Sequence, residues 1–174
     1  MHIEIKQESR TDYQEVFDVN VKAFRQDSEA RLVDALRKND EVFVPELSLV
    51  AMDNNTVIGH ILFTKIAIID KNGEAHISLA LAPMAVHPAC QKKDVGGQLI
   101  YEGLEIARQL GYKSVIVLGH TDYYPKFGFK PASFWKIQAP FDVPDAAFMA
   151  IELVENGLTN ISGTVRYPKE FDMV

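Results

Sequence analysis

The sequence has a single cysteine, Cys90, so no disulfide bond can form within the chain. It contains no apolar run long enough to cross a bilayer, and its opening residues, MHIEIKQESR, lack the hydrophobic block of a signal peptide. The net charge is −6 at pH 7, which argues against nucleic acid as the main partner, because phosphate contacts dominate that affinity. We therefore expect a cytoplasmic protein without membrane or nucleic-acid partners.

Repeats, low-complexity tracts and linker-like segments are also missing. A chain of 174 residues with 47% hydrophobic content suits one ordinary core, so we expect residues 1–174 to form a single domain. No group of histidine, cysteine, aspartate or glutamate residues has the spacing of a metal site, and we expect no metal. Cys90 is near His87, but a proline-containing loop does not favour the fixed geometry of a nucleophile and its base. A bystander thiol is the simpler interpretation.

The first half of the chain predicts one strand, two helices and then strands joined by tight turns. Thr11 is a suitable N-cap for a helix over about 13–24, and Ser28 for a second helix that ends at Arg37. Asn54-Asn55 and Lys71-Asn72-Gly73 are typical of hairpin turns. The segments that favour strands are 2–7, 47–52, 57–69, 75–81, 114–118, 148–154 and 164–167. Antiparallel strands followed by strand–helix–strand predict a mixed α/β sheet.

Residues 79–129 have the most informative pattern in the sequence, a predicted strand, helix and strand in succession. Leu79–Val86 is an apolar run interrupted by Pro83, and proline inside a strand marks a bulge or an edge. A helix follows from Val95 to Leu110, with apolar residues three to four positions apart along one face. The next segment, Ser114–Leu118 (SVIVL), is short and β-branched, which indicates a buried strand.

The loop at the start of this helix has the features of an anion site. A helix N-terminus presents unpaired backbone N–H groups and a partial positive charge. Gly96 and Gly97 permit a close backbone approach, while Lys92 and Lys93 add positive charge. The loop therefore favours a phosphate-bearing ligand, although the glycines alone could equally serve helix packing.

Two motifs in this stretch resemble the GNAT superfamily of GCN5-related N-acetyltransferases. The loop Gln91-x-x-Asp94-x-Gly96 is similar to that family's acyl-CoA signature, and YYPKFGF at 123–129 is similar to its FYEKLGF-type segment. The form GHTDYYPKFGFKPA is closest to a bacterial branch of acetyltransferases. The resemblance covers about residues 1–155.

The resemblance implies a mostly antiparallel central sheet, flanked by helices, whose bulged fourth strand splays from the fifth. It implies acetyl-CoA as co-substrate, without a metal, and direct transfer of the acetyl group to a primary amine of a small molecule or peptide. The pantetheine arm would lie along Met84, Ala85 and Val86, and the pyrophosphate at the loop of Gln91, Lys92, Lys93, Asp94, Val95, Gly96 and Gly97. A homodimer would be ordinary in this family.

Two side chains are the candidate catalytic groups. Tyr124 aligns with the family's tyrosine that protonates the leaving thiolate; the alternative is a core aromatic residue. His120 follows the strand 114–118 and is a candidate base, because an unperturbed histidine titrates near pH ~6.5. A loop histidine with local hydrogen bonds is the alternative. Asp122 could act as the base or orient His120, and deprotonation through water needs no dedicated base.

The sequence departs from the family pattern at two places. Asp94 stands where glycine is usual, and its carboxylate would lie near a polyanion; we expect binding to survive because Lys92 and Lys93 offset the charge. The segment 119–122 replaces a usual asparagine contact, which increases interest in His120. Asp94 favours the alternative of a non-catalytic acyl-CoA-binding or sensing domain. Transfer of a longer acyl group is a further alternative.

Overall fold

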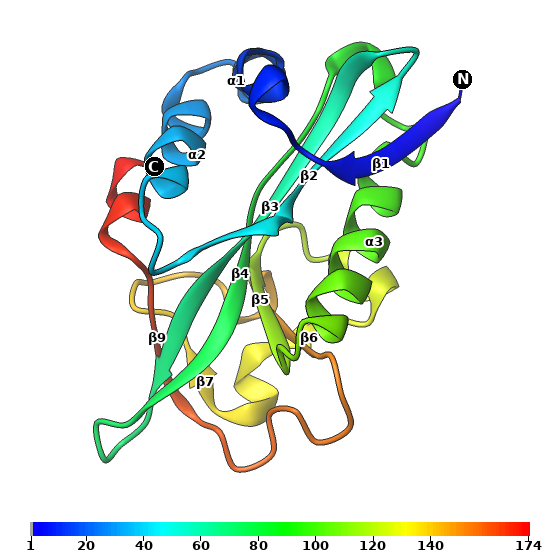
Figure 1. Ribbon diagram of the computed structural model, residues 1–174. Helices are drawn as coiled ribbons and strands as arrows, with labels where there is room; N and C mark the ends of the chain where they lie inside the picture. The colour runs from blue at the N-terminus through cyan, green and yellow to red at the C-terminus, as the bar shows by residue number, and fades with distance from the viewer. Residues whose placement is uncertain (1) are drawn as a thin grey trace.

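The computed structural model of the protein describes residues 2–174 and arranges nine strands in one sheet (Figure 1). The strands are β1 (Ile3–Gln7), β2 (Phe43–Asp53), β3 (Thr56–Ile69), β4 (Ala75–Val86), β5 (Ser114–Leu118), β6 (Lys130–Pro131), β7 (Ile137–Gln138), β8 (Phe148–Glu152) and β9 (Gly163–Arg166). The α-helices are α1 (Tyr13–Phe24), α2 (Ser28–Arg37) and α3 (Val95–Gln109). Among these residues no helix has both the length and the apolar character needed to cross a membrane.

The sheet is mostly antiparallel, as expected. Its order is β1-β2-β3-β4-β5-β8-β6, and β9 pairs with β3 and β7. Among the strand pairs of residues 2–174, only β4–β5 and β7–β9 are parallel. The hairpin turns form as predicted: Asn54 and Asn55 both adopt positive φ, 49° and 67°, which asparagine tolerates.

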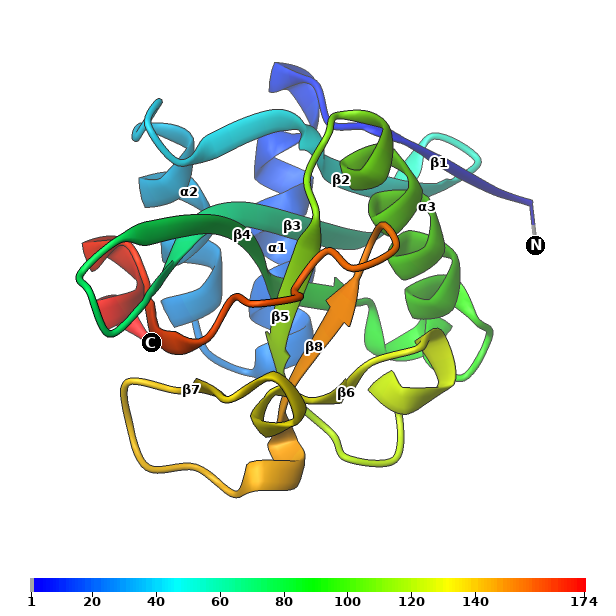
Figure 2. The ribbon, with the colours of Figure 1, turned by 90° about the horizontal axis from the view of Figure 1, so that it is seen from below.

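The bulge predicted at Pro83 is confirmed. The β3–β4 register shifts between the pairs Ile61–Met84 and Phe63–Leu81, so β4 carries one extra residue there. Beyond the bulge β4 no longer follows β5. The two strands pair only at Leu79–Val115 and Ala80–Ile116, and then diverge (Figure 2). The cavity described below lies in the open wedge between these two strands.

Helices cover both faces of the sheet: α1 and α2 pack on one face and α3 on the other (Figures 1 and 2). Both predicted helices, 13–24 and 28–37, form with the expected bounds, but Thr11 is not the cap. The residue that precedes α1 is Asp12, and a 3₁₀ turn at Arg10–Asp12 leads into the helix. Ser9 caps that turn, and its backbone N–H donates to Asp12 Oδ2 (2.8 Å). Asp27, not Ser28, is the residue that precedes α2.

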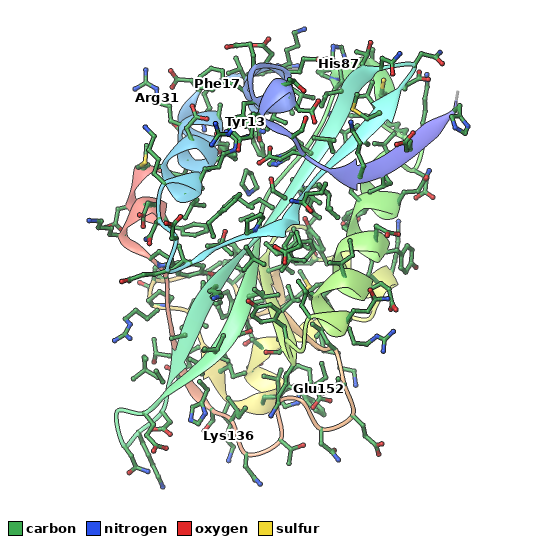
Figure 3. The ribbon with its side chains drawn as sticks, in the orientation of Figure 1. Tyr13, Phe17, Arg31, His87, Lys136 and Glu152 are labelled. Atoms are coloured by element: carbon green, nitrogen blue, oxygen red, sulfur yellow. The ribbon has the colours of Figure 1, made fainter. Side chains whose placement is uncertain are left out.

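The C-terminal segment returns to the face of the sheet that α1 and α2 cover. A 3₁₀ helix at Lys169–Met173 packs against α2, where Asn39 Nδ2 donates to Glu170 Oε2 (3.0 Å). In Figure 3, His87 lies at one end of the molecule, just beyond β4, and Lys136 and Glu152 lie towards the other. The wedge between β4 and β5 thus has α3 on one side and α1, α2 and the chain end on the other.

Candidate active site

A cavity of about 1090 Å³ fills the wedge between β4 and β5. Its wall is formed by the second half of β4, the loop and first turn of α3, the end of β5, the segment 119–124, the facing parts of α1 and α2, and the C-terminal segment. This volume suits a ligand of substantial size. The cavity therefore connects the two faces of the sheet through the gap between strands.

Most of the residues predicted to hold a cofactor meet at this cavity. Those that line it are Met84, Val86, Gln91, Lys92, Asp94, Val95 and Gly96. Three others lie outside the wall. Ala85 is buried in the cluster under α1 and α2, Lys93 is exposed to solvent, and Gly97 lies behind Asp94 in the first turn of α3.

The inner edge of β4 carries backbone groups that β5 does not use. The N–H of His87 donates to Ile58 O on β3 (2.8 Å), so the backbone groups of Val86, one residue earlier, point to the opposite side. There Gln91 Nε2 donates to the Val86 carbonyl at 3.3 Å. The Val86 N–H faces the wedge, where an extended ligand could pair with it as a strand would.

The loop before α3 has an unusual backbone. Lys92 and Asp94 both adopt the left-handed conformation, with φ of 64° and 63°. Aspartate is one of the few residues other than glycine that adopt this conformation readily, which explains how Asp94 replaces the usual glycine. Its side chain makes no capping hydrogen bond to α3. The first-turn N–H groups thus stay available to an anion.

The Asp94 carboxylate turns towards the first turn of α3. A Cβ on Gly97 would overlap Asp94 Oδ1, so a larger residue there would displace the carboxylate from its present position. The Tyr123 hydroxyl lies over the same turn, 2.9 Å from where a Cβ on Gly96 would be. Burial, with a smaller contribution from the Asp94 charge, raises the pKa of Tyr123 above its ordinary value. Glycine at 96 and 97 therefore leaves room for two polar groups at the helix mouth.

Tyr124 lies in the cavity wall and is only 7% exposed. Its ring packs edge-on against Tyr123 (5.2 Å between centroids) and Phe129 (5.7 Å). Burial, and to a lesser extent Tyr123, raises the pKa of Tyr124 to about 12. The hydroxyl has no hydrogen-bond partner among residues 2–174. The group is therefore protonated at neutral pH and free to donate.

Gly119 positions this tyrosine, a role that the sequence did not reveal. A Cβ on Gly119 would overlap the Tyr124 ring, so the ring can lie against the end of β5 only because residue 119 is glycine. The Gly119 N–H donates to Ala147 O (3.0 Å) and holds the segment beside β8. The close approach of ring and backbone is a tertiary contact without a local sequence signal.

His120 is exposed and lines the cavity. Its backbone carbonyl accepts from the N–H groups of Tyr123 (3.3 Å) and Tyr124 (3.5 Å), while its ring has no hydrogen-bond partner within residues 2–174. Asp122 is exposed and does not line the cavity. Cys90 also borders the cavity and is half-buried.

Sequence reasoning did not foresee the opposite half of the wall. Four aromatic side chains line it, from α1, from the loop after β7 and from the C-terminal segment; they are Phe24, Phe141, Tyr167 and Phe171. One carboxylate, Glu29 of α2, lies among them. The prolines of 131–144 obscured the local pattern, and nothing local indicates that the chain end returns to this face.

The fold and this site are those of an acyl-CoA-dependent acetyltransferase. A model of the acetyltransferase (GNAT) family matches residues 7–129, and the chain belongs to this family. The family predicted from the motifs at 91–96 and 123–129 is thereby confirmed.

Two relatives from Escherichia coli K12 extend the similarity over most of the chain. The uncharacterized N-acetyltransferase YjhQ is 37% identical over 161 residues, which covers 90% of this chain and 87% of YjhQ. The uncharacterized N-acetyltransferase YhbS is 32% identical over 152 residues, or 87% of each chain.

Solved structures agree with the fold. The crystal structure of Escherichia coli YhbS in complex with CoA has a TM-score of 0.90 and 29% identity, over 99% of this chain and 93% of that chain. A GNAT family acetyltransferase from Brucella melitensis in complex with acetyl-CoA has a TM-score of 0.78 and 31% identity, over 98% of this chain and 99% of that chain. The predicted mixed sheet with a splayed fourth strand is confirmed.

Proposed function

We propose that the protein moves the acetyl group of acetyl-CoA directly to a primary amine of a small molecule or peptide. The observation that carries this proposal is the wedge between β4 and β5, which has Tyr124 in its wall with a free hydroxyl. The complexes of YhbS with CoA and of the Brucella melitensis enzyme with acetyl-CoA support the choice of donor.

The residues of the wedge fit such a donor. The Val86 N–H can donate to the thioester carbonyl oxygen, where negative charge develops during transfer. The uncapped first turn of α3 and Lys92 can hold the pyrophosphate. Lys93 supports the same anion from solvent, because its side chain is exposed beside the loop. Thus the carbonyl and the phosphates each find donors on one continuous stretch of chain, 86–97.

When bound, acetyl-CoA supplies the acetyl group as a thioester, and transfer forms a C–N bond while the C–S bond breaks. Tyr124 donates its proton to the departing sulfur, and solvent returns a proton to the tyrosine. The amine nitrogen loses one proton, which His120 accepts directly or through water. Holding both reactants in one cleft supplies much of the remaining acceleration.

The test measures acetyl-CoA binding by calorimetry and then free-thiol release from acetyl-CoA with a mixed panel of amines. We expect saturable binding, and thiol release that depends on an amine and is matched by acetylated product. Thiol release without acetylated amine would contradict the proposal.

A second candidate is a non-catalytic acyl-CoA sensor, because the Asp94 carboxylate lies at the mouth of α3. Binding without amine-dependent thiol release for any member of the panel would favour the sensor. An octanoyl-CoA arm in the same assay separates acetyl transfer from transfer of a longer acyl group.

A further inference from the structure

The half of the cavity that faces α1, α2 and the chain end has an aromatic wall. The rings of Phe141 and Tyr167 stack with centroids 6.2 Å apart and planes 21° apart. Tyr167 and Phe171 follow at 5.2 Å. Phe24 of α1 borders the same space. The wall is assembled from three segments that are distant in the sequence, so it is a product of the fold and not of one local motif.

The charge of this half is one-sided. Glu29, in the first turn of α2, is the one charged side chain that α1, α2, Phe141 and the C-terminal segment place in the wall, within residues 2–174. Its two oxygens accept from Gln26 Nε2 at 3.0 and 3.2 Å, which fixes the carboxylate without neutralising it. The basic residue of the wall, Lys92, lies in the loop before α3. An acidic group in this half would find a carboxylate and no cation.

Tyr167 adds one polar atom to the aromatic wall. Burial raises the pKa of Tyr167 to about 12, and its hydroxyl has no hydrogen-bond partner among residues 2–174. It lies in the wall between Phe141 and Phe171, so a bound molecule can meet ring faces and one hydroxyl together.

We propose that the acceptor is a small monoamine that carries an aromatic body and no acidic group, bound by Phe141, Tyr167 and Phe171 beside Glu29. This inference rests on the proposed acetyl transfer and names its substrate class. An aromatic ring gains both apolar burial and edge-to-face contacts on this wall. The ammonium form of the arriving amine is attracted by Glu29 and by the ring faces. It gives one proton to solvent before transfer, and the second, lost as the C–N bond forms, is the one that His120 accepts. The bonds that form and break are those of acetyl transfer and no others.

The test compares four acceptors at fixed acetyl-CoA: phenethylamine, L-phenylalanine, spermidine and a dipeptide amide with a free N-terminus. L-Phenylalanine is the matched probe, because it differs from phenethylamine by one carboxylate. We expect kcat/KM for phenethylamine to exceed that for each of the other three by at least about tenfold. Preference for spermidine, the dipeptide or L-phenylalanine would overturn the substrate class while leaving acetyl transfer intact. If no amine in this set or in a wider panel is acetylated, the proposed function itself fails.

Variants separate recognition from folding. Glu29→Gln should raise KM for phenethylamine by about fivefold and narrow the gap between phenethylamine and L-phenylalanine, with KM for acetyl-CoA unchanged. Phe141→Ala removes a ring that is 46% exposed, and should raise KM for phenethylamine more than KM for spermidine. Glu102→Gln, on the exposed face of α3, is the matched control and should alter neither. An unchanged selectivity ratio in both Glu29→Gln and Phe141→Ala would overturn the assignment of this wall.

Discussion

Two sets of polar side chains, one beneath α1 and α2 and one at the cavity, differ in how their hydrogen bonds are used. Beneath α1 and α2, the Glu8 carboxylate accepts from Arg37 Nε (2.9 Å) and Nη2 (2.7 Å), and His60 Nε2 bonds Ser48 Oγ (3.0 Å). In the cavity, the hydroxyls of Tyr124 and Tyr167 bond to nothing within residues 2–174. The first set joins parts of the fold, and the second faces open space.

The difference separates stability from function. Buried polar groups are tolerated when they are paired, and removing one partner leaves the other unsatisfied. Polar groups without partners at a cavity cost the fold little when they are truncated, but they are the groups that a ligand can use. We therefore expect changes in the first set to alter unfolding and changes in the second to alter catalysis.

Lowering the pH should reduce the free energy of unfolding through the first set, the polar groups beneath α1 and α2. Burial, and then the Arg37 charge, lower the pKa of His60 to about 3, so the folded protein binds its proton more weakly than the unfolded chain. The contribution of neutral His60 to the free energy of unfolding is fully present above pH ~6.5 and is lost as the pH falls towards 3, by up to about 5 kcal/mol. Urea unfolding at pH 7 and pH 4 measures it. In His60→Gln the difference between the free energies of unfolding at pH 7 and pH 4 should be smaller than in the wild type. A difference equal to that of the wild type would contradict the role of His60.

Arg37→Ala should lower the free energy of unfolding at pH 7 by about 3–5 kcal/mol, because it strands the Glu8 carboxylate, whose side chain is 3% exposed. The control is Arg31→Ala on the outer face of α2 (Figure 3), where the ion pair with Asp27 is exposed. We expect that control to change stability by less than about 0.5 kcal/mol. Equal losses in the two variants would break the comparison.

Tyr124→Phe should lower kcat by about 100-fold, because the departing sulfur loses its proton donor. Unfolding should change by less than about 0.5 kcal/mol, since the hydroxyl has no partner in the folded chain. Steady-state kinetics and urea unfolding of the same preparation measure both. Tyr101→Phe, on an exposed position of α3, is the control. Unchanged kcat would leave Tyr124 as a core aromatic residue.

Asp94→Asn should tighten acetyl-CoA binding by about two- to fivefold, because it removes a negative charge at the mouth of α3 and keeps a residue that tolerates positive φ. Asp94→Gly should have a similar effect, and calorimetric titration measures both. Asp122→Asn, outside the cavity wall, should leave the affinity unchanged. Weaker binding in the two Asp94 variants would mean that the carboxylate helps to build the loop.

The features of the structure that have local causes could be predicted from the sequence. Pro83 predicted the bulge in β4, the asparagines at 54 and 55 predicted a hairpin, and the spacing of apolar residues predicted α3. The motif residues Gln91 and Tyr124 likewise predicted one half of the cavity wall.

The other half has non-local causes. Tyr167 and Phe171 reach the cavity only because β9 pairs with β3 and the chain end then packs against α2. From the sequence alone, Glu29 is an acidic residue of the kind commonly found in the first turn of a helix. Its place in the cavity wall becomes evident only once that packing is known. The Thr11 cap was wrong because Thr11 lies inside a 3₁₀ turn, Arg10–Asp12, which the Ser9–Asp12 hydrogen bond closes before α1 begins. Long-range packing, not local propensity, decides the acceptor side.

The parting of β4 from β5 has a consequence for the behaviour of the protein at high concentration. An uncovered strand edge is a template for joining to other chains, and it usually promotes aggregation. Here that edge looks inward, with α3 on one flank and α1, α2 and the chain end on the other. A narrow, extended ligand can reach this edge, but a strand at the edge of another sheet cannot. We therefore expect the unpaired edge of β4 to bind an extended ligand without promoting aggregation.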